Sequence, residues 1–174
     1  ACGGSSAIMN PNKYILDREA KNLTSDVYSS NEFIHRNPRK LGENSLVVLC
    51  SMSGTTPETV AAATFARQKG ALTVGYTNQP TSPLAQVSEF VVKYEWGTES
   101  VAFNTNLGLL YQLTFGILNV LEGNDKFDKV INSLTNLQAV FEKSDVQYKE
   151  QALQFGQEYK DEKVIYTMAS GANY

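Results

Sequence analysis

The chain has 174 residues, of which 42% are hydrophobic and 19% are charged, and its net charge is −3. This balance is ordinary for one soluble globular domain, and it argues against a nucleic-acid-binding protein, which needs a positive surface. No apolar run approaches the roughly 18 residues of a membrane-spanning helix, and no signal peptide is recognisable, so we expect no membrane partner and a cytoplasmic location. The chain does not begin with Met, so we expect residues upstream of Ala1.

The first 35 residues predict helices and at most one short strand. Ser5–Asn22 has its apolar residues at helical spacing, but Pro11 should kink or delay that helix because proline offers no N–H donor. Asp26–Tyr28 is a candidate short strand, and a brief helix is expected to follow it as far as His35.

From residue 45 onward, strand and helix patterns alternate. The continuous apolar run Ser45–Ser51 predicts a buried parallel strand, and Ala71–Thr77 and Glu89–Tyr94 predict two further strands. Pro57–Lys69 has helical spacing, with Thr56 as a plausible N-cap, and Gly70 should end the helix. Asn78–Ser82 contains a proline and polar turn formers, so it is predicted to be a loop.

The last third of the chain is mostly helical by the same criteria. Asn104–Glu122 is apolar nearly all round, which is typical of a helix buried in the core or in a subunit interface. We therefore expect a homodimer or a higher homo-oligomer. An amphipathic helix over Phe127–Phe141, a further helix over Val146–Tyr159 and a last strand over Lys163–Met168 follow. The whole order predicts an α/β fold with a doubly wound parallel β-sheet flanked by helices.

Both ends of the chain carry the same kind of turn. Gly3–Ser6 is a glycine turn of the kind that normally follows a strand, and the end of the chain reads as a strand followed by Ala169–Asn173. This pattern predicts a duplicated architecture. The first domain would then be residues 1–161, with its first strand missing, and a second unit would begin at 162–174 and continue beyond Tyr174.

The strongest local signal is the loop between the first predicted strand and its helix. It contains Ser51, Ser53, Gly54, Thr55 and Thr56. A helix N-terminus has unpaired N–H groups and about half a positive charge, so hydroxyls around a glycine at that point form an anion cradle without any cation. An ordinary N-cap in a polar loop is the alternative. The glycine patterns of nucleotide P-loops and of dinucleotide-binding folds are absent.

The glycine turn near the N-terminus is a second candidate part of the site. If the strand order is 2-1-3-4-5, the loops after strands one and three flank the point where the strand order reverses, and ligands of open parallel sheets bind there. These loops are Gly3–Ser6 and Ser51–Thr56. Their small and hydroxyl side chains are what a phosphosugar site would require.

With these two loops, the sequence resembles the SIS (sugar isomerase) domain family, which has a flavodoxin-like fold. Leu46–Pro57 is similar to the SIS phosphate loop, an apolar strand followed by Ser-x-Ser-Gly-x-Thr. Cys2–Ser5 resembles the Cys-Gly-x-Ser turn of enzymes with two SIS units, and Val164–Tyr174 is similar to the start of their second unit. Gly3–Ser5 followed by Pro11–Tyr14 most resembles the bacterial fructosamine deglycases, which act on sugar–amino-acid 6-phosphates.

The resemblance implies roles for individual residues. Phosphate would be bound by Ser51, Ser53 and Thr56 with the rest of their loop, and the sugar would lie near Gly4, Ser5, Met52 and Glu99. Glu99 is otherwise a solvated loop carboxylate. Met52 replaces a glutamine of glucosamine-6-phosphate synthase, whose isomerase domain is one alternative. A phosphosugar-sensing module of a transcriptional regulator is the other.

The resemblance also implies what this chain lacks. Deglycation and isomerisation move a proton between adjacent carbons, which needs a base, and in enzymes with two SIS units that base comes mainly from the second domain. The catalytic residues therefore stay unknown, and we expect this chain alone to be inactive. No cofactor and no metal are expected, and Cys2 and Cys50 should be reduced thiols.

Overall fold

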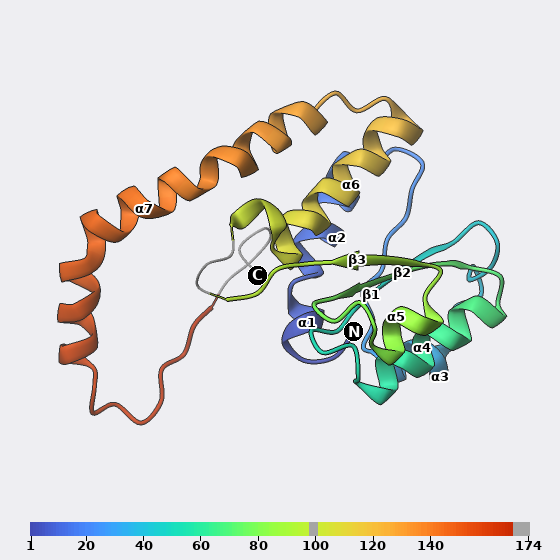
Figure 1. The fold of residues 1–174 in the computed structure, drawn as a ribbon, viewed down its shortest axis with the longest axis horizontal. Helices are drawn as coiled ribbons and strands as arrows, with labels where there is room; N and C mark the ends of the chain where they lie inside the picture. The colour runs from blue at the N-terminus through green and yellow to red at the C-terminus, as the bar shows by residue number, and fades with distance from the viewer. Residues whose placement is uncertain (98–100, 169–174) are drawn as a thin grey trace.

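The computed structural model describes residues 1–97 and 101–168. Its central element is a small parallel sheet with helices on both faces (Figure 1). In chain order, the elements are α1 (Gly4–Ala7), α2 (Asn10–Glu19), α3 (Ser30–Arg36), β1 (Leu46–Cys50), α4 (Pro57–Gln68), β2 (Leu72–Thr77), α5 (Pro83–Val87), β3 (Phe90–Lys93), the 3-10 helix η1 (Ala102–Asn104), α6 (Asn106–Glu122) and α7 (Phe127–Glu158).

The three strands lie in the order β1-β2-β3, and both pairs are parallel. Leu49 of β1 pairs with Gly75 of β2, which in turn pairs with Val91 of β3. Since the strands are parallel, their carboxyl ends lie along one edge of the sheet, and the loop from β1 to α4 begins there. The three predicted apolar strands are thus confirmed.

Alternating side chains of the strands supply two separate cores. Leu49 faces the layer of α3, α4 and α5, where the alanines of α4 let that helix approach the sheet closely. Its neighbour Cys50 faces the opposite layer, where it lies in one buried cluster with Tyr76 of β2 and Leu110 of α6. Figure 1 shows these two helical layers on either side of the strands, so the predicted doubly wound architecture is confirmed.

The N-terminal third departs from the sequence prediction in two places. The single helix predicted over Ser5–Asn22 is split into α1 and α2, because Pro11 is accommodated in the first turn of α2, where a missing N–H costs little. Asp26–Tyr28 forms no strand. The Tyr28 ring packs instead on Phe33 of α3, with ring centres 6.0 Å apart. This segment therefore packs against a helix rather than pairing with a strand.

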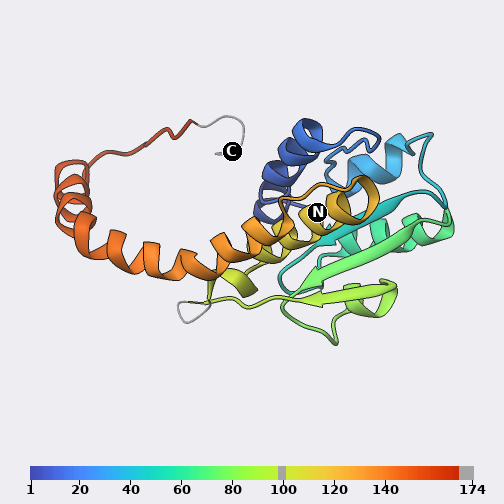
Figure 2. The same cartoon turned by 90° about the horizontal axis from the view of Figure 1, so that it is seen from above.

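Other differences lie further along the chain. The polar loop after β2 leads into the short helix α5, whose N-cap Ser82 was not predicted as such. The two helices predicted between Phe127 and Tyr159 are one helix, α7, which projects from the body as a long arm (Figure 2). Lys163–Met168 is not a strand, because no other strand of the described chain lies beside it to accept its hydrogen bonds.

With the missing strand counted as one and Asp26–Tyr28 as two, β1, β2 and β3 are strands three, four and five of the order 2-1-3-4-5. They lie side by side in that order, and no other strand of the described residues pairs with them. The N-terminal residue Ala1 is buried beside Cys50 in the second core, and its carbonyl accepts a hydrogen bond from the backbone N–H of Ser30 at 3.0 Å. The segment before α1 therefore packs near the end of β1 without forming a strand.

The apolar helix α6 is confirmed, and it fastens α2 to the body. Leu110 and Leu118 are buried, and the Thr114 hydroxyl donates a hydrogen bond to the side-chain oxygen of Asn12 at 2.9 Å. Its last turn is different, because Val120 and Leu121 are exposed. Within the described ranges, none of the helices combines the length and apolarity that crossing a membrane requires.

Candidate functional site

The Ser51–Thr56 loop lies where β1 ends and α4 begins, as predicted. Ser51 is buried, and its hydroxyl pairs with the Thr56 hydroxyl at 2.9 Å, which joins the two ends of the loop. Ser53 and Thr55 are exposed and pair with each other at 2.7 Å. The structure therefore brings the four predicted hydroxyls together in two pairs, one at the base of the loop and one at its tip.

Gly54 is the residue that lets the loop close on its neighbours. Its φ of 65° lies in the left-handed region that favours glycine. A Cβ atom at this position would lie 2.0 Å from the Ser82 hydroxyl oxygen and 2.9 Å from that of Thr77. No other residue fits here without moving the loop or the segment behind it.

Several backbone donors of the loop and of the start of α4 are free. Thr56 occupies the N-cap position, but its hydroxyl caps no N–H of the helix, because it pairs with Ser51 instead. Within the described residues, the N–H groups of Met52, Ser53, Thr56 and Glu58 donate to no acceptor of the chain. Together with the positive end of a 12-residue helix, these groups make the loop a favourable place for an anion.

The glycine turn near the N-terminus lies against the same end of β1. Ala1, just before this turn, lies in one buried cluster with Cys50, the residue that precedes the loop, and the Ser5 hydroxyl is close enough to the Cys50 thiol to influence its pKa. Cys2 lies 4.0 Å from the hydroxyl of Thr59, in the first turn of α4. The two turns that the sequence analysis selected are therefore neighbours in space.

The two thiols differ in their environments. Burial raises the pKa of the Cys50 thiol to about 11, although the Ser5 hydroxyl opposes this shift. Burial also acts to raise the pKa of Cys2, but hydrogen bonds with Ser30 and Thr59 outweigh it, so this pKa is lower than usual. Both cysteines are free. Across the described part of the chain, no three His, Cys, Asp or Glu side chains come close enough to share a metal ion.

The structure describes three of the four residues predicted to contact the sugar. Gly4 is exposed and Ser5 is partly buried. The Met52 side chain is exposed at the rim of the loop. Glu99 lies outside the described residues. Thr77 and Ser82, which support the loop from behind, were not predicted as site residues, because Thr77 was predicted only as the end of a strand and Ser82 only as part of a loop. No local pattern marks their contact with Gly54.

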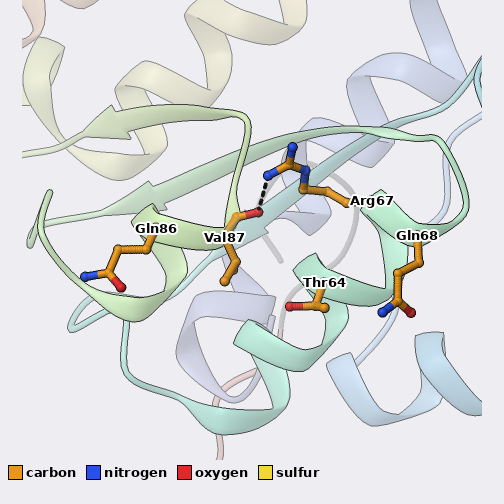
Figure 3. A pocket seen from close by; sticks show the side chains of 5 residues that line it. All are labelled: Thr64, Arg67, Gln68, Gln86 and Val87. Carbon is orange, nitrogen blue, oxygen red and sulfur yellow. Dashed lines mark hydrogen bonds between the residues drawn. The ribbon is translucent and has the colours of Figure 1, made fainter.

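Two hollows on the surface of the described residues lie away from the loop. One of about 440 Å³ lies between α4 and α5, and there Arg67 donates a hydrogen bond to the Val87 carbonyl at 3.3 Å (Figure 3). Another, of about 590 Å³, is lined by residues of α2 and of the segment after it, together with Lys40. Neither contains a residue of the Ser51–Thr56 loop. On hydrogen-bonding grounds the loop is the better candidate, because it presents free donors at the edge of the sheet where parallel folds bind ligands.

Comparisons with known proteins place the chain in a family. The SIS domain family model matches residues 1–115. Fructosamine deglycase FrlB of Bacillus subtilis (strain 168) is 60% identical over 174 residues, which is all of this chain and 53% of that protein. A glutamine–fructose-6-phosphate aminotransferase (isomerizing) of Caldanaerobacter subterraneus is 27% identical over 184 residues, which is all of this chain and 29% of that protein.

A solved structure from Bacillus subtilis, provisionally described as a phosphosugar isomerase, has a TM-score of 0.96 and 60% identity to this chain. The match covers 99% of this chain and 53% of that one. The chain thus spans about half the length of the deglycase and of the solved protein that it matches.

The environment of Gly54 leads to a stability prediction. Gly54→Ala should lower the free energy of unfolding by about 2–5 kcal/mol, because it adds a steric clash with Ser82 to the strain of a positive φ. Gly123→Ala is the matched control. Gly123 has the same φ of 65° and nothing within 4 Å of its added Cβ, so its cost should be only about 1–2 kcal/mol. Urea denaturation of both variants measures the difference, and equal losses would contradict the proposed close packing.

Proposed function

Because this chain belongs to the SIS domain family, we propose that its Ser51–Thr56 loop binds the phosphate group of a sugar phosphate. The free N–H groups at the start of α4 support this proposal most directly, since a phosphate oxygen accepts hydrogen bonds from such groups. The exposed hydroxyls of Ser53 and Thr55 would add further donors once the ligand replaces their mutual hydrogen bond.

The sugar itself would extend from the loop toward the N-terminal turn. We propose that Gly4, Ser5, Met52 and Glu99 lie along it, with the Ser5 hydroxyl as a hydrogen-bonding group. The contact between Ser5 and Cys50 supports this direction, because it places Ser5 next to the start of the loop. The exposed Met52 side chain would supply an apolar contact at the rim.

We propose further that the whole protein is a cytoplasmic enzyme. It would cleave a sugar–amino-acid 6-phosphate into a hexose 6-phosphate and an amino acid. The 60% identity to a fructosamine deglycase supports this reaction more strongly than the 27% identity to the aminotransferase supports amino transfer. Met52 points the same way, because the corresponding position of the resembling synthases is glutamine.

The domain division proposed from the sequence fits this reaction. Residues 1–161 would be the first SIS unit, and a second would begin at 162. The reaction moves a proton between adjacent carbons, so it needs a base near the sugar. The Ser51–Thr56 loop contains no carboxylate and no histidine. We therefore propose that this chain contributes phosphate and sugar binding, and that the proton-transferring groups lie mainly in the second unit.

We also propose that the protein forms a homodimer or a higher homo-oligomer. The support is the last turn of α6, where the exposed fractions of Val120 and Leu121 are 80% and 64%. Two adjacent apolar side chains exposed to this extent are costly in water, and a second copy of the chain would cover them.

A double substitution tests the phosphate site. Ser53→Ala with Thr56→Val in the intact protein should weaken binding of fructose 6-phosphate by about 2–4 kcal/mol, because hydrogen bonds to a charged group are lost. Calorimetry gives the dissociation constant directly. Thr64→Val with Ser133→Ala is the control, since both hydroxyls only bond carbonyls of their own helices. Unchanged affinity in the first variant would reject the site.

The proposed division of labour predicts a difference between two polypeptides. The intact protein should release hexose 6-phosphate from fructoselysine 6-phosphate, whereas the 174-residue chain alone should show no turnover, because it lacks the proposed base. A coupled assay for the released hexose 6-phosphate measures both. Turnover by the shorter chain would show that the catalytic groups lie within it.

The interface proposal can be tested by light scattering at about tens of micromolar protein. The unaltered protein should be a dimer or larger, and Val120→Asp with Leu121→Asp should shift it toward monomer by burying charge in the contact. Ala61→Asp serves as control, because Ala61 is exposed on α4, in the other helical layer. A monomeric unaltered protein would contradict the proposal.

A further inference from the structure

The peptide groups of the phosphate loop are held from behind by the segment that joins β2 to α5, here called the brace (Thr77–Leu84). The Met52 carbonyl accepts two hydrogen bonds from it, one from the Thr77 hydroxyl at 3.1 Å and one from the Asn78 N–H at 3.0 Å. The Gly54 carbonyl accepts one from the Leu84 N–H at 2.9 Å. Two of the loop's carbonyls therefore point toward the brace.

The planarity of the peptide bond turns this observation into a statement about the donors. In a trans peptide, the carbonyl of one residue and the N–H of the next point in opposite directions. The described part of the chain contains no cis peptide bond. Holding the Met52 carbonyl toward the brace thus directs the Ser53 N–H away from it, and holding the Gly54 carbonyl does the same for the Thr55 N–H.

Thr77 is well suited to hold such a group. It is the last residue of β2, it is fully buried, and its hydroxyl oxygen also accepts a hydrogen bond from the Gln79 N–H at 3.1 Å. The acceptor bond orients the hydroxyl so that its single hydrogen is available to Met52. The same oxygen would lie only 2.9 Å from a Cβ atom on Gly54, so no gap separates the brace from the loop.

We propose that Thr77 is a positioning residue for anion binding: its hydroxyl fixes the Met52–Ser53 peptide so that the Ser53 N–H faces the ligand. This inference rests on the proposed function of the loop. Thr77 itself does not touch the phosphate in this arrangement. It acts through the peptide that it holds, 25 residues earlier in the chain.

The strand that carries Thr77 also offers a matched control. Thr73 lies four residues earlier on the same face of β2, and it is equally buried. Its hydroxyl also forms a hydrogen bond with the backbone, accepting from the Glu89 N–H at 2.9 Å. That bond lies at the opposite end of the strand from the loop. Replacing either threonine by valine therefore removes a comparable buried hydrogen bond, but only one of the two holds the loop.

The test compares three variants of the intact protein with fructose 6-phosphate as the titrated ligand. Thr77→Val should raise the dissociation constant about fivefold to tenfold, the effect of losing one positioned hydrogen bond. Thr77→Ser keeps the hydroxyl and should bind within about twofold of the unaltered protein. Thr73→Val should also bind normally, even though its thermal midpoint should fall about as far as that of Thr77→Val.

The outcomes separate this inference from the function on which it rests. Normal binding by Thr77→Val, or equal weakening in Thr73→Val and Thr77→Val, overturns the positioning role. If the Ser53→Ala/Thr56→Val protein has lost affinity while Thr77→Val has not, the phosphate site stands and only the role of Thr77 fails. If that double variant binds normally, the phosphate site itself is wrong.

Discussion

The turn from β1 into α4 depends on one constraint: backbone N–H groups at a helix start have no partner within the helix. The chain does not remove this deficit with its own side chains. Thr56 stands at the N-cap but its hydroxyl pairs with Ser51, so the Glu58 N–H in the first turn stays free. The glycine at position 54 and the brace behind it keep the loop in this shape. A bound anion would complete a hydrogen-bonding arrangement that the protein alone leaves open.

Much of the fold could be predicted because its signals are local. β1, α4 and β2 each carry their pattern within a dozen residues, and Pro57 and Gly70 mark the limits of the helix between them. The hydroxyl-rich loop was found for the same reason, since a strand, a glycine and a helix start follow one another directly. The proximity of Ser5 to the end of β1 was expected from the topology of parallel sheets rather than from any local pattern.

What could not be predicted depends on partners distant in the sequence. Thr77 and Ser82 support Gly54 across more than twenty residues, and nothing near them in the sequence indicates that contact. The segment Lys163–Met168 has the composition of a strand, but a strand forms only beside another one. α7 continues through residues 142–145 because no proline or glycine stops it there, although the apolar pattern weakens.

The composition of the loop has a consequence for how binding responds to acidity. Hydroxyl and amide groups neither gain nor lose protons near neutrality, so a binding loop built only from them keeps its hydrogen-bond donors as the medium is acidified. A phosphate ester, by contrast, takes up a proton with a pKa of about 6. The ligand rather than the protein would then set the pH dependence of the complex, and occupancy would decline as the dianion becomes the monoanion.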